Sequence, residues 1–406
     1  MSVSVTVRNL LMATACLLTP ALHAITFEDY VDPNSQWDEA YVTGQFAANN
    51  TAFNAEQANQ SLTQAEIDAG ASLAREDFQG SYDLTLNANY RRVFSTLPLV
   101  WSLEASATGS LSRGDERGAR STDNIASRAV GRYDNYRERY PNQFWFTGGE
   151  FRDDSPGNDP YAFVQGGIGF GRAINATALA KALRLVSVLQ DYSLLTIYPS
   201  DVVLLHLAQT INREPEYRAN FGDDGFREAW FDQIEETLIG AGLIGGTGLG
   251  ALGVIKMDEV LIRENINTRE HGLVARIGIG YVISDPAGNE GEPAINLNFR
   301  FAKPFGYRAQ LIEDASFSRS LERSGTGTFR NQLIYTYEMS DVVDWVNNWS
   351  HIRQEGNRDD TLSSGFVYDI SNTLEFDLAL ILSRSDEDAV SGVKGRLSTS
   401  LRYRLR

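Results

Sequence analysis

Few side chains in this sequence are spaced for acid–base or nucleophilic chemistry. Histidine occurs four times, and three of these, His206, His271 and His351, lie beyond the first 24 residues. His206 stands between two leucines in an apolar helical pattern, which is typical of a packing or surface residue. His351 follows Ser350 directly, but adjacent residues of a strand point to opposite faces, so the pair does not form a nucleophile–base contact. The sequence therefore predicts no catalytic residue.

One motif matches a cofactor fingerprint, namely the G-x-G-x-x-G of Gly240 to Gly245. The fingerprint needs a preceding strand, a following helix and a later acidic residue, whereas here it follows an amphipathic helical pattern. The uncharged run from Leu238 to Ile255 is interpreted as a flexible glycine-rich connector or a tight packing segment; contact with membrane or barrel lumen is the alternative. The single cysteine, Cys16, lies in the candidate export signal. No cofactor and no metal site is expected.

A larger set of candidate functional residues consists of charged side chains that alternate with apolar residues along the sequence. Its members are Arg276, Arg300, Arg396, Arg402, Arg404, Glu104, Glu375 and Asp377. A charge that faces lipid costs roughly 2–4 kcal/mol at the bilayer midplane, so we expect all eight to face a barrel lumen. Because both signs occur, a water-filled selective lumen and a lumen closed by ion pairs remain open alternatives.

In the segments that carry these charges, apolar and polar residues alternate with a period of two. In the segment 273–283 the odd residues are almost all apolar, and segments 82–90 and 101–111 behave in the same way. A two-residue period with one apolar face predicts β-strands, and runs of about ten residues match tilted membrane-spanning strands. Short connections alternate with longer, mostly acidic ones, as in barrels with short periplasmic turns and long external loops.

The predicted fold is mainly β, an antiparallel transmembrane β-barrel of about 12–14 strands with an inserted α-helical periplasmic domain. We divide the chain into five segments on this basis. They are a signal peptide (1–24), an N-terminal arm with a short helix near 64–75 and a first strand at 37–46 (25–78), an N-terminal barrel segment (79–172), a helical insert on the periplasmic side (173–271) and a C-terminal barrel segment (272–406).

The first segment and the composition indicate export. Arg8 precedes an apolar stretch from Leu10 to Leu22, and Ala24 fits the last residue before cleavage. A lipoprotein signal ending at Cys16 is the alternative. The net charge of −17 argues against a nucleic-acid partner, because phosphate contacts need clustered Lys and Arg.

The final segment carries a resemblance to a known class. Its alternating hydrophobic residues Leu397, Leu401, Tyr403 and Leu405 resemble the C-terminal strand of Gram-negative outer-membrane β-barrels, although that class usually ends on an aromatic residue and this chain ends on Arg406. The resemblance covers the signal, 79–172 and 272–406, and no specific family is assigned. It implies the cell outer membrane as location, and outer-membrane lipid and lipopolysaccharide as partners.

Three functions are compatible with this pattern. The first is a porin-like channel for small polar solutes. The second is a non-conducting envelope scaffold or export component whose segment 173–271 binds a periplasmic protein. The third, an outer-membrane lipid-modifying hydrolase, needs a Ser, His or acid cluster at one rim, and no such cluster is predicted.

Overall fold

The computed structural model describes residues 25–49, 80–114, 116–154, 159–245, 247–285, 291–321, 327–354, 356–386 and 392–405. The predicted signal segment 1–24 and the predicted helix near 64–75 lie outside these residues.

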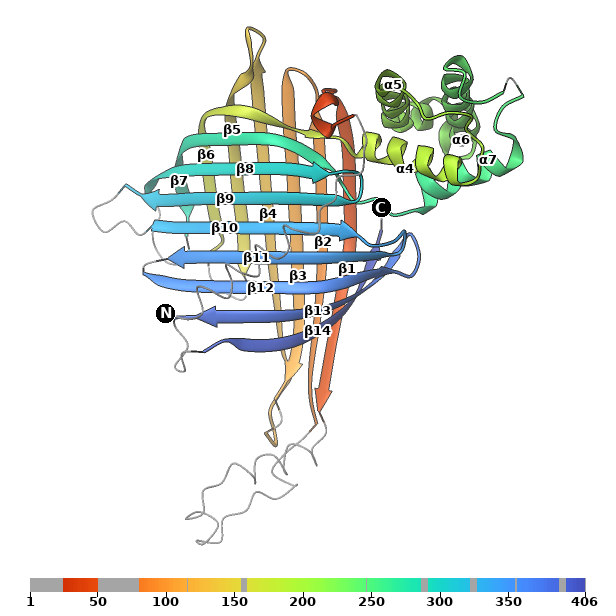
Figure 1. Cartoon of the computed structure of the whole chain (residues 1–406). Helices are drawn as coiled ribbons and strands as arrows, with labels where there is room; N and C mark the ends of the chain where they lie inside the picture. Colours follow the sequence, from red (N-terminus) through yellow and green to blue (C-terminus); the bar gives the residue numbers. More distant parts are fainter. Residues whose placement is uncertain are drawn as a thin grey trace, which may run out of the picture.

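Fourteen antiparallel strands among the described residues form a closed barrel (Figure 1). The strands are β1 (Ser35–Asn49), β2 (Ser81–Ser95), β3 (Leu99–Arg113), β4 (Thr122–Arg137), β5 (Tyr140–Asp154), β6 (Tyr161–Asn175), β7 (Glu270–Ser284), β8 (Pro293–Phe305), β9 (Ala309–Ser320), β10 (Gly327–Glu338), β11 (Val343–Gln354), β12 (Asn357–Asp369), β13 (Leu374–Ser385) and β14 (Lys394–Arg404). Consecutive strands pair with each other, and β1 pairs with β14, with Tyr41 opposite Arg404. The predicted fold class is confirmed.

The apolar faces point away from the barrel axis. In β7 the odd residues Ile277, Ile279 and Tyr281 are exposed, whereas Val274 on the opposite face is buried. A soluble protein would bury such a face, because burial removes apolar surface from water. Exposed apolar residues on strand after strand therefore indicate a wall that contacts lipid.

The first strand differs from the arm expected for residues 25–78. Ser35–Asn49 forms β1, which is a complete wall strand between β2 and β14 and is longer than the predicted strand at 37–46. Its outward residues include Ala40, Val42 and Gly44, which are small and give a weak apolar signal. Barrel closure stabilises β1 by pairing it with two neighbouring strands, which the local sequence pattern does not predict.

The segment between β6 and β7 forms a helical domain beside one end of the barrel (Figure 1). Its elements are α4 (Thr177–Asp191), α5 (Asp201–Asn212), α6 (Glu214–Gly240), α7 (Gly250–Asp258) and the π-helical turn η4 (Glu259–Arg263). Ser200 occupies the expected N-cap position of α5. Gly222 has a φ of 72° and interrupts α6. No helix in the described part of the chain is long and apolar enough to cross a membrane.

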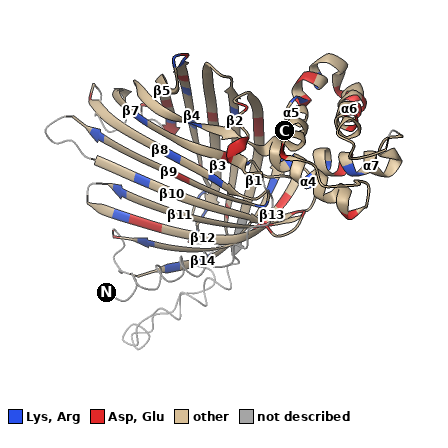
Figure 2. Ribbon diagram, turned by 45° about the horizontal axis from the view of Figure 1, so that its top comes forward, with Lys and Arg blue, Asp and Glu red and all other residues tan. Residues whose placement is uncertain are grey.

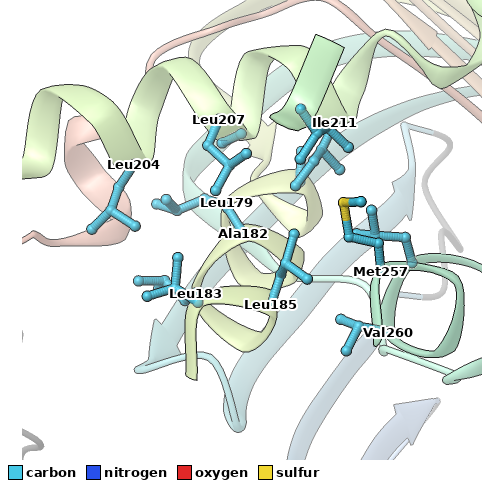
Figure 3. Close-up of a cluster of buried hydrophobic side chains, with 14 of the residues drawn as sticks. Leu179, Ala182, Leu183, Leu185, Leu204, Leu207, Ile211, Met257 and Val260 are labelled. Atoms are coloured by element: carbon cyan, nitrogen blue, oxygen red, sulfur yellow. The ribbon is translucent and has the colours of Figure 1, made fainter. Parts of the chain in front are cut away.

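The domain has a core of its own. Leu179, Leu183 and Leu185 of α4 meet Leu204 and Leu207 of α5 (Figure 3). The short 3-10 helix η2 (Phe27–Asp29) also reaches this core, where Phe27 and Tyr30 are buried. The beginning of the described chain is thereby held against the insert, next to the start of β1.

The glycine-rich run combines a connector with a packed helical segment. Residues 250–255 already belong to α7, where Gly253 packs against the Leu249 side chain. The fingerprint glycines follow helix α6 instead of a strand. Gly242 has a φ of 70°, which favours glycine and ends the helix.

Candidate functional site: the charged interior and its covered mouth

The densest charge cluster lies on the inner face of β13 and β14. Arg402 Nη1 is 2.9 Å from Glu375 Oε2, and its Nη2 is 3.7 Å from Asp377 Oδ2. Arg404 Nη2 approaches the other oxygen of Glu375 at 2.7 Å. Glu375 is buried between the two guanidinium groups. Arg396 lies on the same face of β14 as Arg402, nearer the opposite end of the strand.

A second ion pair joins strands that are not neighbours. Arg276 Nη2 of β7 is 2.5 Å from Asp134 Oδ2 of β4, although β5 and β6 lie between them. Gly169, beside Arg276 on β6, leaves the necessary room, since an added Cβ would lie 2.2 Å from the Phe144 ring. The Arg276 guanidinium also lies 5.3 Å from the centre of that ring. Both charged side chains are buried, so the pair is a fixed part of the interior.

The remaining predicted charges also have partners. Arg300 lies 2.6 Å from Glu270 and 2.7 Å from Asp314. Glu104 lies 3.0 Å from Arg91 of β2. The structure therefore brings seven of the eight predicted residues into ion pairs, in separate groups distributed around the wall. Figure 2 shows charges recurring along the strands as well as on the insert.

On one stretch of the wall, small polar groups outnumber charged ones, and the Arg91–Glu104 pair is the ion pair described there. On β3 the residues alternating with the exposed Leu103 and Leu111 are mostly serines and threonines, including Ser106 and Thr108. Thr108 donates a hydrogen bond to Asn87 Oδ1 of β2 at 2.8 Å. Such short side chains do not reach far into a barrel of this size. Eight-stranded barrels are filled by their side chains, whereas barrels of 16–18 strands leave an aqueous channel.

The extended segment after η4 crosses the insert-side mouth of the barrel. Asn265 Nδ2 donates to Asp369 at 3.3 Å and to Glu375 at 3.1 Å. Asn267 Nδ2 donates to Asp344 Oδ2 at 2.7 Å. Because these acids end or begin β11, β12 and β13, the segment is bonded to several strands of the rim.

Arg269 anchors the end of that segment. Its side chain is fully buried, and Nη2 lies 2.5 Å from Glu338 Oε1 at the end of β10. Its Nε donates to the Tyr307 carbonyl in the β8–β9 turn at 3.1 Å. Acidic groups on neighbouring strand ends would repel one another, so one guanidinium and two amides stabilise this part of the rim.

The body of the insert meets the rim next to these strands, at the start of β1, which pairs with β14. Asn212 Nδ2 donates to the Asn34 carbonyl just before β1 at 2.7 Å. A polar cavity of about 350 Å³ lies at this junction, lined by the start of β1, helices α4 to α6, the segment 265–268 and Arg404. Trp37, Glu39 and Lys181 are among its walls. The helical domain thus touches the barrel mouth at β1 as well as at β10 to β14.

Burial shifts the pKa of ionisable groups in the insert, among them Lys181 and Glu264. Burial lowers the pKa of Lys181, because its charged form loses hydration, and Glu214 opposes that shift. Burial raises the pKa of Glu264, and the neighbouring Arg184 guanidinium, 2.7 Å away, opposes that rise. Lys181 Nζ reaches only the Leu261 carbonyl at 3.5 Å, so its cost of burial is less well offset.

Sequence reasoning missed most of the partners. Asp134, Glu270 and Asp314 complete interior pairs, and Asn265 and Arg269 bind the rim. The alternation of β4 and β9 could have identified Asp134 and Asp314 as inward residues. Nothing local distinguishes Asn265 and Arg269, since they lie in an extended segment outside any periodic pattern.

Two histidines, His271 and His351, occupy structural positions, whereas His206 is exposed on α5. His271 Nε2 is 2.8 Å from the Tyr30 carbonyl and ties the N-terminal segment to β7. His351 Nδ1 is 2.8 Å from Asp360 Oδ1, and its ring stacks beside Trp349. Ser350 alternates with His351 on β11 and faces the other way. Within the described residues, no group of three His, Cys, Asp or Glu side chains is arranged to hold a metal.

No protein-family model matches the chain, and no curated protein matches it either. Solved barrels superpose on it only loosely. The low-pH structure of Pseudomonas putida OprB has 7% identity and a TM-score of 0.35, with 91% of this chain and 93% of that chain covered. The β domain of the Bordetella autotransporter Brka has 8% identity and a TM-score of 0.27 (92% and 99% covered). LpxR from Salmonella typhimurium has 9% identity and a TM-score of 0.27 (90% and 99% covered). Likeness at this level carries no argument about function.

The class follows from the barrel itself. A closed sheet leaves no unpaired edge, so it is one of only two architectures that can span a bilayer. Here the closed sheet has an apolar outer face and a charged interior. The chain is an outer-membrane β-barrel protein with an inserted helical domain, as the sequence predicted.

Proposed function

We propose that the protein is a channel for small polar solutes, with the helical insert lying across its periplasmic mouth. The observation that supports this best is the inner face of β2 and β3, where, apart from the Arg91–Glu104 pair, short hydroxyl and amide side chains such as Asn87 and Thr108 stand where a filled barrel would have bulky ones. The ion pairs of the interior add charges of both signs, which suit hydrated polar solutes better than apolar ones.

The decisive experiment is conductance of the purified protein in planar bilayers, with heat-modifiable gel migration as the folding control. We expect discrete, ohmic steps. Thr108→Trp places a large ring inside the barrel and should lower the step size. The matched control is Ala107→Trp, because Ala107 is the adjacent residue on the outer face, and it should leave the step size unchanged. Folded protein that never conducts would contradict the channel.

A second candidate is a scaffold in which the insert binds a periplasmic protein. The observation that favours it is the outer side of α7, where Leu252, Val254 and Ile255 are exposed together. Clustered exposed apolar residues mark interaction surfaces more often than isolated ones do. A photoreactive side chain at position 255 should crosslink to a periplasmic protein in cells, and one at position 202, which is exposed on α5, should not. Equal labelling at both positions would argue against the scaffold.

A further inference from the structure

An apolar cavity lies against the barrel wall, across β4 to β10. Its volume is about 720 Å³. The floor includes Ala275 and Ala315, whose side chains are small, and larger apolar residues such as Phe170 and Phe317 form its sides. The cavity is therefore an apolar groove with a narrow floor of small residues.

The groove opens on the outer face of the barrel. Ile168 and Phe170 are 60% and 55% exposed, and Ala275 shares its face with the exposed Ile277. Arg276 is also among the lining residues, but its guanidinium points to the other face, where it pairs with Asp134. Residues of the opposite wall, on β1, β2, β13 and β14, do not line the cavity. Whatever occupies the groove comes from the membrane and not from the lumen.

One end of the groove carries a positive charge. Arg137 and Gln143 line it, and they flank the turn between β4 and β5. This turn is at the same end of the barrel as the helical insert. Arg139 lies in the same turn over the Tyr140 ring, at 5.7 Å, with Glu138 between the two arginines. In a chain of net charge −17 this turn is a local site of positive charge.

We propose that the groove holds an acyl chain of a phospholipid from the periplasmic leaflet, with the lipid phosphate at the Arg137 guanidinium. From β5, next to the Arg137 turn, to β10 the groove spans five strand spacings, roughly 24 Å. One leaflet contributes about half of the roughly 30 Å hydrocarbon thickness, so a single chain lying obliquely fits this length. The guanidinium supplies planar, charge-assisted hydrogen bonds of the kind that phosphate accepts. This inference does not depend on whether the lumen conducts.

The test is native mass spectrometry of the protein released from nanodiscs of phosphatidylglycerol and phosphatidylethanolamine. The wild-type protein should retain one phospholipid. Ala315→Trp fills the floor and should reduce retention about tenfold, equivalent to about 1.4 kcal/mol. Arg137→Gln should reduce retention of both lipids, since both carry the phosphate. The control is Ala129→Trp, the same substitution on the outer face of β4, outside the groove.

Three outcomes would overturn the proposal. Equal lipid retention by Ala315→Trp and Ala129→Trp would show that the groove binds no lipid. Retention of detergent without any lipid would also show that the groove does not bind lipid. Lipopolysaccharide in place of phospholipid, tested by adding it to the nanodiscs, would contradict the assignment to the periplasmic leaflet. Heat-modifiable migration reports folding of each variant, and Ala275→Trp replaces Ala315→Trp if the latter does not fold.

Discussion

The barrel and the helical insert arrange the same residue types in opposite ways. In β7 the Ile279 side chain is 64% exposed, while in α5 the Leu207 side chain is completely buried. The insert holds its apolar residues inside and its charges outside, because water surrounds it. The barrel holds charged pairs such as Arg276–Asp134 inside and its apolar residues outside, because lipid surrounds it. The two regions differ in their solvent, and each can be disturbed separately.

The largest expected effect is in the core of the insert. Trp230 is fully buried and donates a hydrogen bond from its ring nitrogen to the Thr210 carbonyl at 3.0 Å. Trp230→Ala should lower the stability of the insert by about 3–5 kcal/mol and leave the barrel folded. Trypsin should then cleave after Arg227 while heat-modifiable migration persists. Phe221→Ala, at an exposed position of the same helix, is the control. If Trp230→Ala also abolished heat-modifiable migration, the barrel and the insert would fold as one unit.

A comparable effect is expected from removing one interior charge. Arg276→Ala leaves the carboxylate of Asp134, which is 2% exposed, without its partner. Breaking a buried pair in this way costs about 3–5 kcal/mol, whereas removing both charges costs less. Urea unfolding of the protein in lipid vesicles should therefore give a larger free energy of unfolding for the double variant Arg276→Ala/Asp134→Asn than for the single variant Arg276→Ala. The reverse order would mean that the pair is hydrated in the folded protein.

The outer wall should respond to a charge by an intermediate amount. Ile279→Arg places a guanidinium on the lipid face and should cost roughly 2–4 kcal/mol, measured by the same urea unfolding. The same substitution at Val202, 76% exposed on the insert, should change stability by less than about 0.5 kcal/mol. Similar costs at both positions would contradict the difference in solvent on which the comparison rests.

The smallest effect concerns Lys181 and is a pH dependence. Its pKa is lowered in the folded protein, so the unfolded chain binds more protons between the folded pKa and the ordinary lysine value of 10.5. The stability of the insert should therefore rise as pH increases through that window, since the buried charge is lost. Below the folded pKa the destabilisation is fully present. Lys181→Met should abolish this rise in thermal unfolding curves, and a rise that persists would assign it to another group.

Most of the barrel strands, and the face of each strand that is apolar, could be predicted from the sequence. A period of two decides which face of a strand is apolar, and that signal alone predicted inward positions for Arg402 and Glu375. It was weak for β1, where the outward residues Ala40 and Gly44 are small. The helices at 177–191 and 201–212 followed from their apolar spacing, because each has to bury one face.

The sequence by itself determined the faces, the insert and the location of the protein, because these depend on local periodicity and on the solvent that each face requires. Only the tertiary structure decided the partners. Arg276 and Asp134 are 142 residues apart, and Asn265 meets Glu375 across 110 residues. Periodicity states where a side chain points but not what lies opposite. That depends on strand register and barrel closure, which bring distant segments together only when the whole sheet has formed.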